Sequence, residues 1–106
     1  MYFLMICRHG DQAEIAALRD ALRAEHRAWV RTGGDGLARV LTGSALWDEA
    51  GAGIGNFGIL EAETEADARG FAEGDPFATG GVVARITLTR LADGFRADRI
   101  VPLTEG

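Results

Sequence analysis

Two residues of this sequence, His26 and Asp75, have the side-chain types that general acid–base chemistry requires. A carboxylate beside an imidazole fixes the tautomer of the ring and stabilises its charged form, which suits proton transfer near neutral pH. His26 follows Leu22 by four residues and precedes Trp29 by three, at the margin of an apolar helical stripe. Asp75 precedes Pro76, which favours an extended conformation at the aspartate. Taken singly, each has a plainer interpretation, as a half-buried histidine with a local hydrogen bond and as a turn-capping aspartate.

Four further side chains are secondary candidates. Arg23 lies one turn before His26 and is suited to hold an anionic or phenolic oxygen, or else it is a solvated helix residue. Ser44 either donates a hydrogen bond into a pocket or occupies a turn, and Phe77 is either core or a wall for a substrate. His9 ends an apolar run, where a loop residue is the ordinary interpretation and a second acid or base is the alternative.

The composition excludes several kinds of chemistry. All 11 cationic side chains are arginines, so a lysine Schiff base or lysine nucleophile is excluded. The single cysteine, Cys7, is predicted to be a small buried hydrophobe, and it cannot form an intrachain disulfide or a thiolate metal cluster. The spacing of His9, His26 and the carboxylates fits no standard metal motif. We therefore expect no metal and no cofactor.

The charge balance bears on the possible partners. A net charge of −5 argues against nucleic acid and against an anionic membrane surface, since both require clustered Lys or Arg. The apolar start at residues 1–7 is short and lacks a basic leader, and no run of about 20 apolar residues occurs. These features predict a cytoplasmic protein that binds neither nucleic acid nor membrane.

Apolar periodicity and capping signals predict the elements. Asp11 with Glu14, and Thr64 with Asp67, are capping-box variants that would open two helices. A glycine-rich stretch at 33–36 is expected to end the first helix in a left-handed cap. The predicted elements are a strand at 2–7, a helix at 12–31, a strand at 37–47 bent near Gly43, a strand at 54–61, a helix at 64–73, a strand at 82–91, and an extended tail or short fifth strand at 95–103.

This β-α-β-β-α-β order predicts an α+β fold of the ferredoxin-like kind, with both helices on one face of an antiparallel sheet. We expect one domain over 1–106, with a core at 2–91 and a C-terminal extension at 92–106. Both faces of the first strand are apolar, because Tyr2, Leu4 and Ile6 alternate with other apolar residues. A second subunit would cover the outer face, so a homodimer is predicted.

The chain resembles the YCII-like family over roughly Tyr2 to Arg90. The matching pieces are the opening strand ending in Cys7-Arg8, the segment from Arg23 to His26, the Gly43 turn with Leu46, the strand from Gly55 to Glu61, and the stretch from Phe71 to Phe77 followed by Gly80-Gly81-Val82. The resemblance implies a ferredoxin-like dimer, a dimeric α+β barrel-like assembly, with a cleft near the subunit contact. It also implies a histidine–aspartate active site at His26 and Asp75.

The assigned chemistry in the family includes dehydrohalogenation of a chlorinated aromatic diol or triol. The chain departs from the family pattern at Ala24, where a proline is common, and at Ser44-Ala45, where the family often has Gly-Pro-Leu after strand two. The second departure changes a wall of the expected pocket, so a substrate does not transfer from a relative.

Three functions therefore compete. The first is an enzyme of the lyase or isomerase type, without a cofactor, in which His26 moves a proton on a small cyclic or aromatic substrate and Asp75 orients the ring. The second is a domain that binds or senses a small molecule without turnover. The third is an assembly module in which the pair only joins two helices, and it predicts a dry core around both groups.

Overall fold

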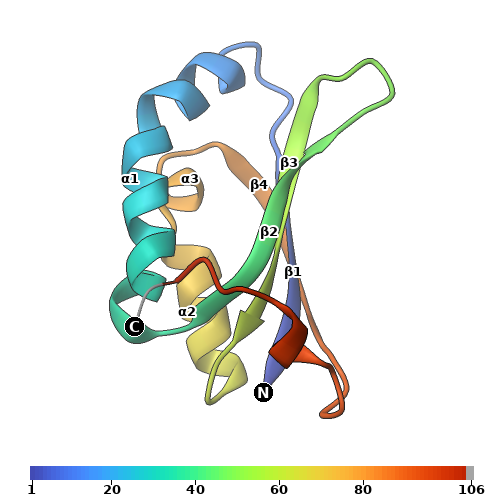
Figure 1. Cartoon of the computed structure of the whole chain (residues 1–106). Helices are drawn as coiled ribbons and strands as arrows, with labels where there is room; N and C mark the ends of the chain where they lie inside the picture. The colour runs from blue at the N-terminus through green and yellow to red at the C-terminus, as the bar shows by residue number, and fades with distance from the viewer. Residues whose placement is uncertain (105–106) are drawn as a thin grey trace.

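The computed structural model describes residues 1–104 of the chain, and Figure 1 shows its elements. Four strands and two α-helices follow the expected order. A short third α-helix before the last strand was not predicted, and a 3₁₀ helix lies in the tail. The bounds are β1 Tyr2–His9, α1 Ile15–Gly36, β2 Arg39–Trp47, β3 Gly53–Glu61, α2 Glu65–Gly74, α3 Pro76–Thr79, β4 Val83–Arg90 and the 3₁₀ helix Ala97–Arg99.

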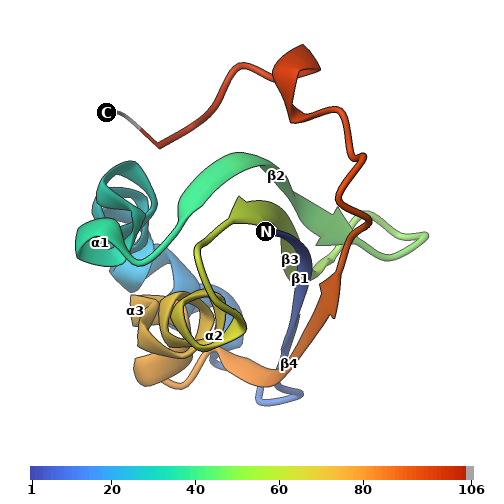
Figure 2. The ribbon, with the colours of Figure 1, turned by 90° about the horizontal axis from the view of Figure 1, so that it is seen from below.

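The four strands form one antiparallel sheet in the order β2-β3-β1-β4. β3 lies between β1 and β2, so the β1-α1-β2 unit is split by a third strand. Figure 2 shows all three helices on one face of the curved sheet, and the C-terminal tail runs from β4 around the outside of the sheet to β2 and reaches α1 at Thr104. The predicted ferredoxin-like α+β fold is confirmed.

The core forms between β1 and α2. Phe3, Met5 and Cys7 alternate along β1 and are buried on the face that meets the helices. α2 contributes the predicted face of Ala68, Phe71 and Ala72, all buried. A large apolar side chain buried in this way stabilises the fold by about 1.5–3 kcal/mol, so these contacts hold α2 on the sheet.

A second apolar cluster lies at the N-terminal part of α1. Ile15, Phe77 and Val82 are its buried members, with Leu18 and Leu22 packed against them. Trp29 packs instead against the main cluster. His26 therefore occupies the stretch of α1 between the side chains that join the two clusters.

The start of α1 differs from the prediction. Glu14 is the N-cap residue and makes no capping hydrogen bond through its side chain, so the Asp11–Glu14 capping box is wrong and the helix begins at Ile15. At the other end the prediction is confirmed. Gly33, Gly34 and Asp35 have φ of 64°, 63° and 59°, the left-handed conformation that terminates a right-handed helix.

The capping prediction for α2 is confirmed, because the Thr64 side chain accepts a hydrogen bond from the Asp67 N–H. The Asp75-Pro76 step then opens α3. The Asp75 carboxylate caps it by accepting from the Phe77 N–H at 2.9 Å, and Pro76 takes the first helical position, where no N–H is needed. The carboxylate that caps α3 is therefore the same one that is predicted to pair with His26.

Two predictions about β2 and the tail need correction. The pairing of β2 with β3 is regular at Gly43 and shifts at two other places, between Val40 and Thr42, where the buried Leu41 is the extra residue, and between Leu46 and Trp47. The tail contains a 3₁₀ helix rather than a fifth strand in its described part. It crosses to β2, where Thr104 Oγ1 accepts from the Val40 N–H at 2.8 Å and donates to the Val30 carbonyl at 2.8 Å.

The outer face of the sheet is less buried than the face that meets the helices. Tyr2, Leu4 and Ile6 are only half-buried in the single chain. Their pairing partners Ile59, opposite Leu4, and Phe57, opposite Ile6, share this face and are also half-buried. Phe95 of the tail contacts the Tyr2 ring edge-on at 5.5 Å between centroids, so the tail covers only part of the face.

Candidate active site

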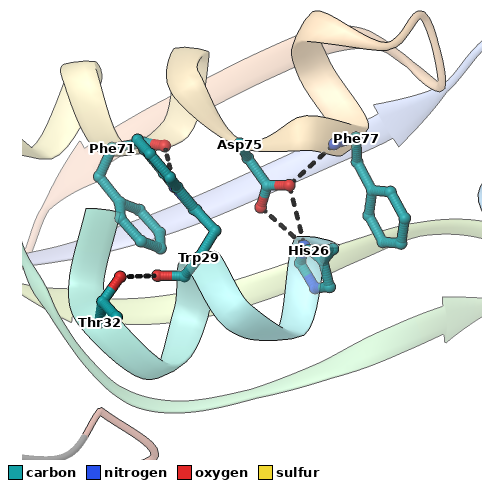
Figure 3. Close-up of polar contacts among 6 residues, drawn as sticks. All are labelled: His26, Trp29, Thr32, Phe71, Asp75 and Phe77. Atoms are coloured by element: carbon teal, nitrogen blue, oxygen red, sulfur yellow. Dashed lines mark hydrogen bonds and ion pairs between the residues drawn. The ribbon is translucent and has the colours of Figure 1, made fainter. Parts of the chain in front are cut away.

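His26 and Asp75 lie in direct contact although 49 positions separate them in the chain. The His26 Nδ1 atom is 2.9 Å from Asp75 Oδ1 and 2.8 Å from Oδ2. Figure 3 shows the histidine on α1 facing the carboxylate at the junction of α2 and α3. The second ring nitrogen, Nε2, lies on the side of the ring away from the aspartate.

The partners of Asp75 determine the tautomer of His26. An ionised carboxylate only accepts hydrogen bonds, and Asp75 Oδ1 already accepts from the Phe77 N–H. Nδ1 of the imidazole must therefore carry the proton that Asp75 accepts. In the neutral ring, Nε2 is left with a free lone pair, which is the arrangement a general base needs.

Phe77 covers one face of the imidazole. The two rings are stacked with centroids 4.0 Å apart and an interplanar angle of 11°. The Asp75 side chain is 9% exposed, whereas the His26 side chain retains 21% exposure. The carboxylate is thus enclosed by protein, while part of the histidine remains open to a ligand.

Trp29 fixes the distance between α1 and α2. Its indole N–H donates to the Phe71 carbonyl at 3.0 Å, and its ring stacks on Phe71 (Figure 3). A Cβ at Gly34 or Gly74 would lie within 3 Å of this indole ring. The two glycines therefore form the slot that Trp29 fills, and this contact holds His26, one turn earlier, opposite Asp75.

A cavity of about 580 Å³ adjoins the pair and extends between α1 and strands β2 and β3. This volume is in the range of small-molecule sites. Both His26 and Asp75 line it. On the sheet side the lining includes Gly43, Ala45 and Gly58, whose small size leaves the space open. If the protein were an assembly module, His26 and Asp75 would be expected to lie in a dry core. The cavity beside them does not favour that hypothesis.

The other predicted site residues lie around this cavity, and their roles stay predictions. Phe77 is buried and lines the cavity beside His26. Arg23 also lines it, with its guanidinium paired to Asp20. Ser44 contributes to the lining, but it is exposed and its hydroxyl donates to the neighbouring Ala45 carbonyl at 3.0 Å.

The sequence reasoning missed two groups of lining residues. One is Asn56 on β3, whose Oδ1 atom is buried and has no hydrogen-bond partner in the described part of the chain. No local pattern distinguishes it, since it is one polar residue in a strand. The other is Arg19, Arg27 and Arg31, which line the cavity with Arg23. Their four-residue spacing was a readable signal.

Cys7 behaves as predicted for a buried hydrophobe. It is 5% exposed within the core. Burial, with a smaller contribution from the charge of Asp75, raises the pKa of its thiol to about 12. The thiolate that a nucleophile needs is therefore not formed near neutral pH.

His9 is the last residue of β1 and lies outside the cavity lining. Burial, and then the charge of Arg19, lower its pKa below the usual 6.5, while a hydrogen bond with the Gly53 backbone acts in the opposite direction. Its Nε2 atom is buried without a partner in the described residues. The folded state therefore prefers neutral His9.

This preference predicts a stability change with pH. Below about pH 6.5 the unfolded chain protonates His9 and the folded chain does so less readily, so acidification favours unfolding. We expect the urea midpoint to fall between about pH 7 and pH 5, and to fall less in His9→Gln, where this site no longer titrates. A His9→Gln protein whose midpoint falls as much as that of the wild type would contradict the assignment.

Residues 1–104 contain no group of three or more His, Cys, Asp or Glu side chains arranged to hold a metal ion. Over the same residues, no helix is both long and apolar enough to span a membrane.

The fold and the site together define a small ferredoxin-like α+β domain with a histidine–aspartate pair at a cavity. The sequence profile of the YCII-related domain matches residues 1–92, and the chain belongs to this family. No curated protein matches the sequence.

The solved structures with a similar fold include the two that follow. The first is 5-chloro-2-hydroxyhydroquinone dehydrochlorinase from Burkholderia phenoliruptrix AC1100, in complex with 2,5-dihydroxybenzoquinone, at 23% identity and a TM-score of 0.71. The match covers 89% of this chain and 96% of that one. The second is Rv0793 from Mycobacterium tuberculosis, at 16% identity and a TM-score of 0.50, covering 90% of this chain and 99% of that one. At these identities the likeness concerns the fold.

Proposed function

We propose that this protein is an enzyme that performs cofactor-independent acid–base chemistry of the lyase or isomerase type on a small organic substrate. The observation that carries the proposal is the contact between His26 Nδ1 and the buried Asp75 carboxylate at the wall of a cavity. We also propose that the protein acts in the cytoplasm, with residues 2–91 as the functional core and 92–106 as an extension.

In the proposed reaction, His26 Nε2 takes a proton from a C–H or O–H group of the substrate. Asp75 stabilises the imidazolium that forms and keeps Nδ1 as the donor. In an isomerase, the ring then returns the proton to another atom of the substrate. In a lyase, a bond to a leaving group breaks with its electron pair, and the ring donates the proton to that group or to water.

A dehydrochlorinase of similar fold forms a complex with 2,5-dihydroxybenzoquinone, and this supports a small cyclic substrate for this protein. The apolar part of the lining, which includes Met5, Val30, Val40 and Phe71, suits a ring. Phe77, stacked on His26, would direct the edge of such a ring toward the imidazole.

The experiment that tests the proposal separates turnover from binding. The protein is incubated with small hydroxylated and halogenated cyclic compounds, binding is scored by thermal stabilisation, and each mixture is analysed by mass spectrometry and proton NMR. Conversion of a bound compound supports the enzyme. The incubations are made in D₂O. Ligands that stabilise the protein but are all recovered unchanged, with no deuterium incorporated at carbon, would favour a binding domain instead.

The proposal includes a homodimer formed through the outer face of the sheet. The half-buried apolar row on β1 and β3 would be covered by a second copy. We expect light scattering at micromolar concentration to give twice the mass of one chain, and Ile6→Glu to give the single-chain mass. Ala66→Glu, on the exposed side of α2, is the control that should leave the mass unchanged. A monomeric wild-type protein would contradict the dimer.

A further inference from the structure

The arginines of α1 give the cavity a positive electrostatic potential. Arg19, Arg23, Arg27 and Arg31 follow one another at four-residue intervals, and all four line it. Among the described residues, the lining contains one acidic side chain, Asp75. Four positive charges against one negative leave a net +3 when His26 is neutral. The whole chain, by contrast, has a net charge of −5, so the positive charge is concentrated at this site.

Three of these guanidinium groups have no acidic partner in the part of the chain that the structure describes. Among residues 1–104, Arg23 pairs with Asp20, but Arg19, Arg27 and Arg31 take part in no ion pair. The Arg19 Nε atom is buried without a hydrogen-bond partner. Like charges four residues apart on a helix repel and disfavour it. Arg27 and Arg31 are exposed, so water solvates their N–H groups when no ligand is bound. A ligand that carries negative charge would relieve the repulsion and accept charge-assisted hydrogen bonds from these side chains.

Asn56 provides the second observation. It pairs with Ala45 across β2 and β3, and both line the cavity. Its Oδ1 atom is buried and has no partner in the described residues. A buried acceptor without a partner costs stability, and an O–H or N–H donor on a ligand would remove that cost.

We propose that the cavity selects a small organic acid: a ring that carries a carboxylate, held by Arg27 and Arg31 with Arg23, and a hydroxyl group that donates to Asn56. This assignment rests on the proposed function, since it places the ring of the acid beside His26. The arginines position and select the substrate, and His26 moves the proton.

The test measures binding rather than turnover, and the first probe is 4-hydroxybenzoate. Its methyl ester lacks the charge, and benzoate lacks the hydroxyl group. Calorimetry at low ionic strength should give a dissociation constant about 10-fold or more lower for the acid than for the ester. Added salt should weaken binding of the acid alone, because salt screens charge.

Matched variants assign the preference to residues. Arg27→Gln should reduce the acid-over-ester preference by about 2- to 5-fold, because Arg27 is exposed and solvent screens its charge. Arg69→Gln makes the same change of charge on α2, away from the cavity lining, and should leave the preference intact. Asn56→Ala should reduce the preference for 4-hydroxybenzoate over benzoate and leave the preference for acid over ester unchanged.

Three results would overturn the inference: equal or tighter binding of the ester, no detectable binding of either acid at millimolar concentration, or an equal effect of Arg69→Gln and Arg27→Gln. Loss of the dimer in Arg27→Gln without a change in probe binding would assign the arginines to the subunit contact instead. Failure of the proposed function looks different. Acids would then bind with the predicted preference, but no bound compound would be converted. Conversely, turnover confined to neutral compounds would contradict the proposed selection of an acid and would still support the proposed enzyme.

Discussion

Replacing His26 with glutamine should reduce kcat by about 10²–10⁴-fold on any substrate that the turnover screen identifies, because general acid–base catalysis contributes that much. The glutamine amide can still donate a hydrogen bond to Asp75, so the contact between α1 and the α2–α3 junction is largely retained. What is lost is the Nε2 lone pair that accepts the proton. Steady-state kinetics, with far-UV circular dichroism to confirm folding, measure this effect.

His9→Gln is the matched control for this variant. It makes the same substitution at the only other histidine, which lies outside the cavity lining. We expect its kcat to equal that of the wild type near neutral pH. A folded His26→Gln protein with wild-type kcat would remove His26 from the mechanism, and an equal loss in both variants would mean that the effect is not specific to the site.

Substitution of Asp75 should separate its two roles. Asparagine caps helices as well as aspartate does, so Asp75→Asn should keep the hydrogen bond from the Phe77 N–H and most of the stability. The neutral amide does not stabilise an imidazolium, and its NH₂ group can donate to Nδ1 and so favour the other tautomer. We expect kcat to fall by about 10²–10⁴-fold with little change in the urea midpoint.

Asp75→Ala should lose both roles. Removal of the cap costs about 1 kcal/mol, and the hydrogen bond between His26 and the buried carboxylate adds about 1.5–3 kcal/mol. A loss of about 2.5–4 kcal/mol in the free energy of unfolding is therefore expected, measured by urea denaturation. If Asp75→Asn had full activity, the charge and the tautomer would not matter. If Asp75→Ala were as stable as the wild type, the hydrogen bonds would contribute nothing net.

The elements of this fold were predictable where their signals are local. Thr64 and Asp67 stand three residues apart and cap α2, and the buried face of α2 follows from helical spacing around Phe71. The same kind of reasoning failed at Asp11, where a capping pattern is present but the helix starts later. A capping box is a short pattern, and the chain around it decides whether the geometry is adopted.

The tail shows a second limit. Residues 95–103 read as extended or as a strand, but their described part contains a 3₁₀ helix, and Thr104 bonds to the backbone of Val40 and Val30. Those partners are more than 60 positions away in the sequence. The bulge at Leu41 lies beside these contacts, and no pattern within β2 itself indicates it.

By itself the sequence determined the order of the elements, the helical face that carries His26 and the capping position of Asp75, because each depends on residues a few positions apart. Only the tertiary structure decided that the two side chains meet, since Trp29 must first fill the slot at Gly34 and Gly74 to bring α1 against α2. It also decided that four arginines and Asn56 share one cavity. Packing between distant elements sets these distances, and local sequence does not record them.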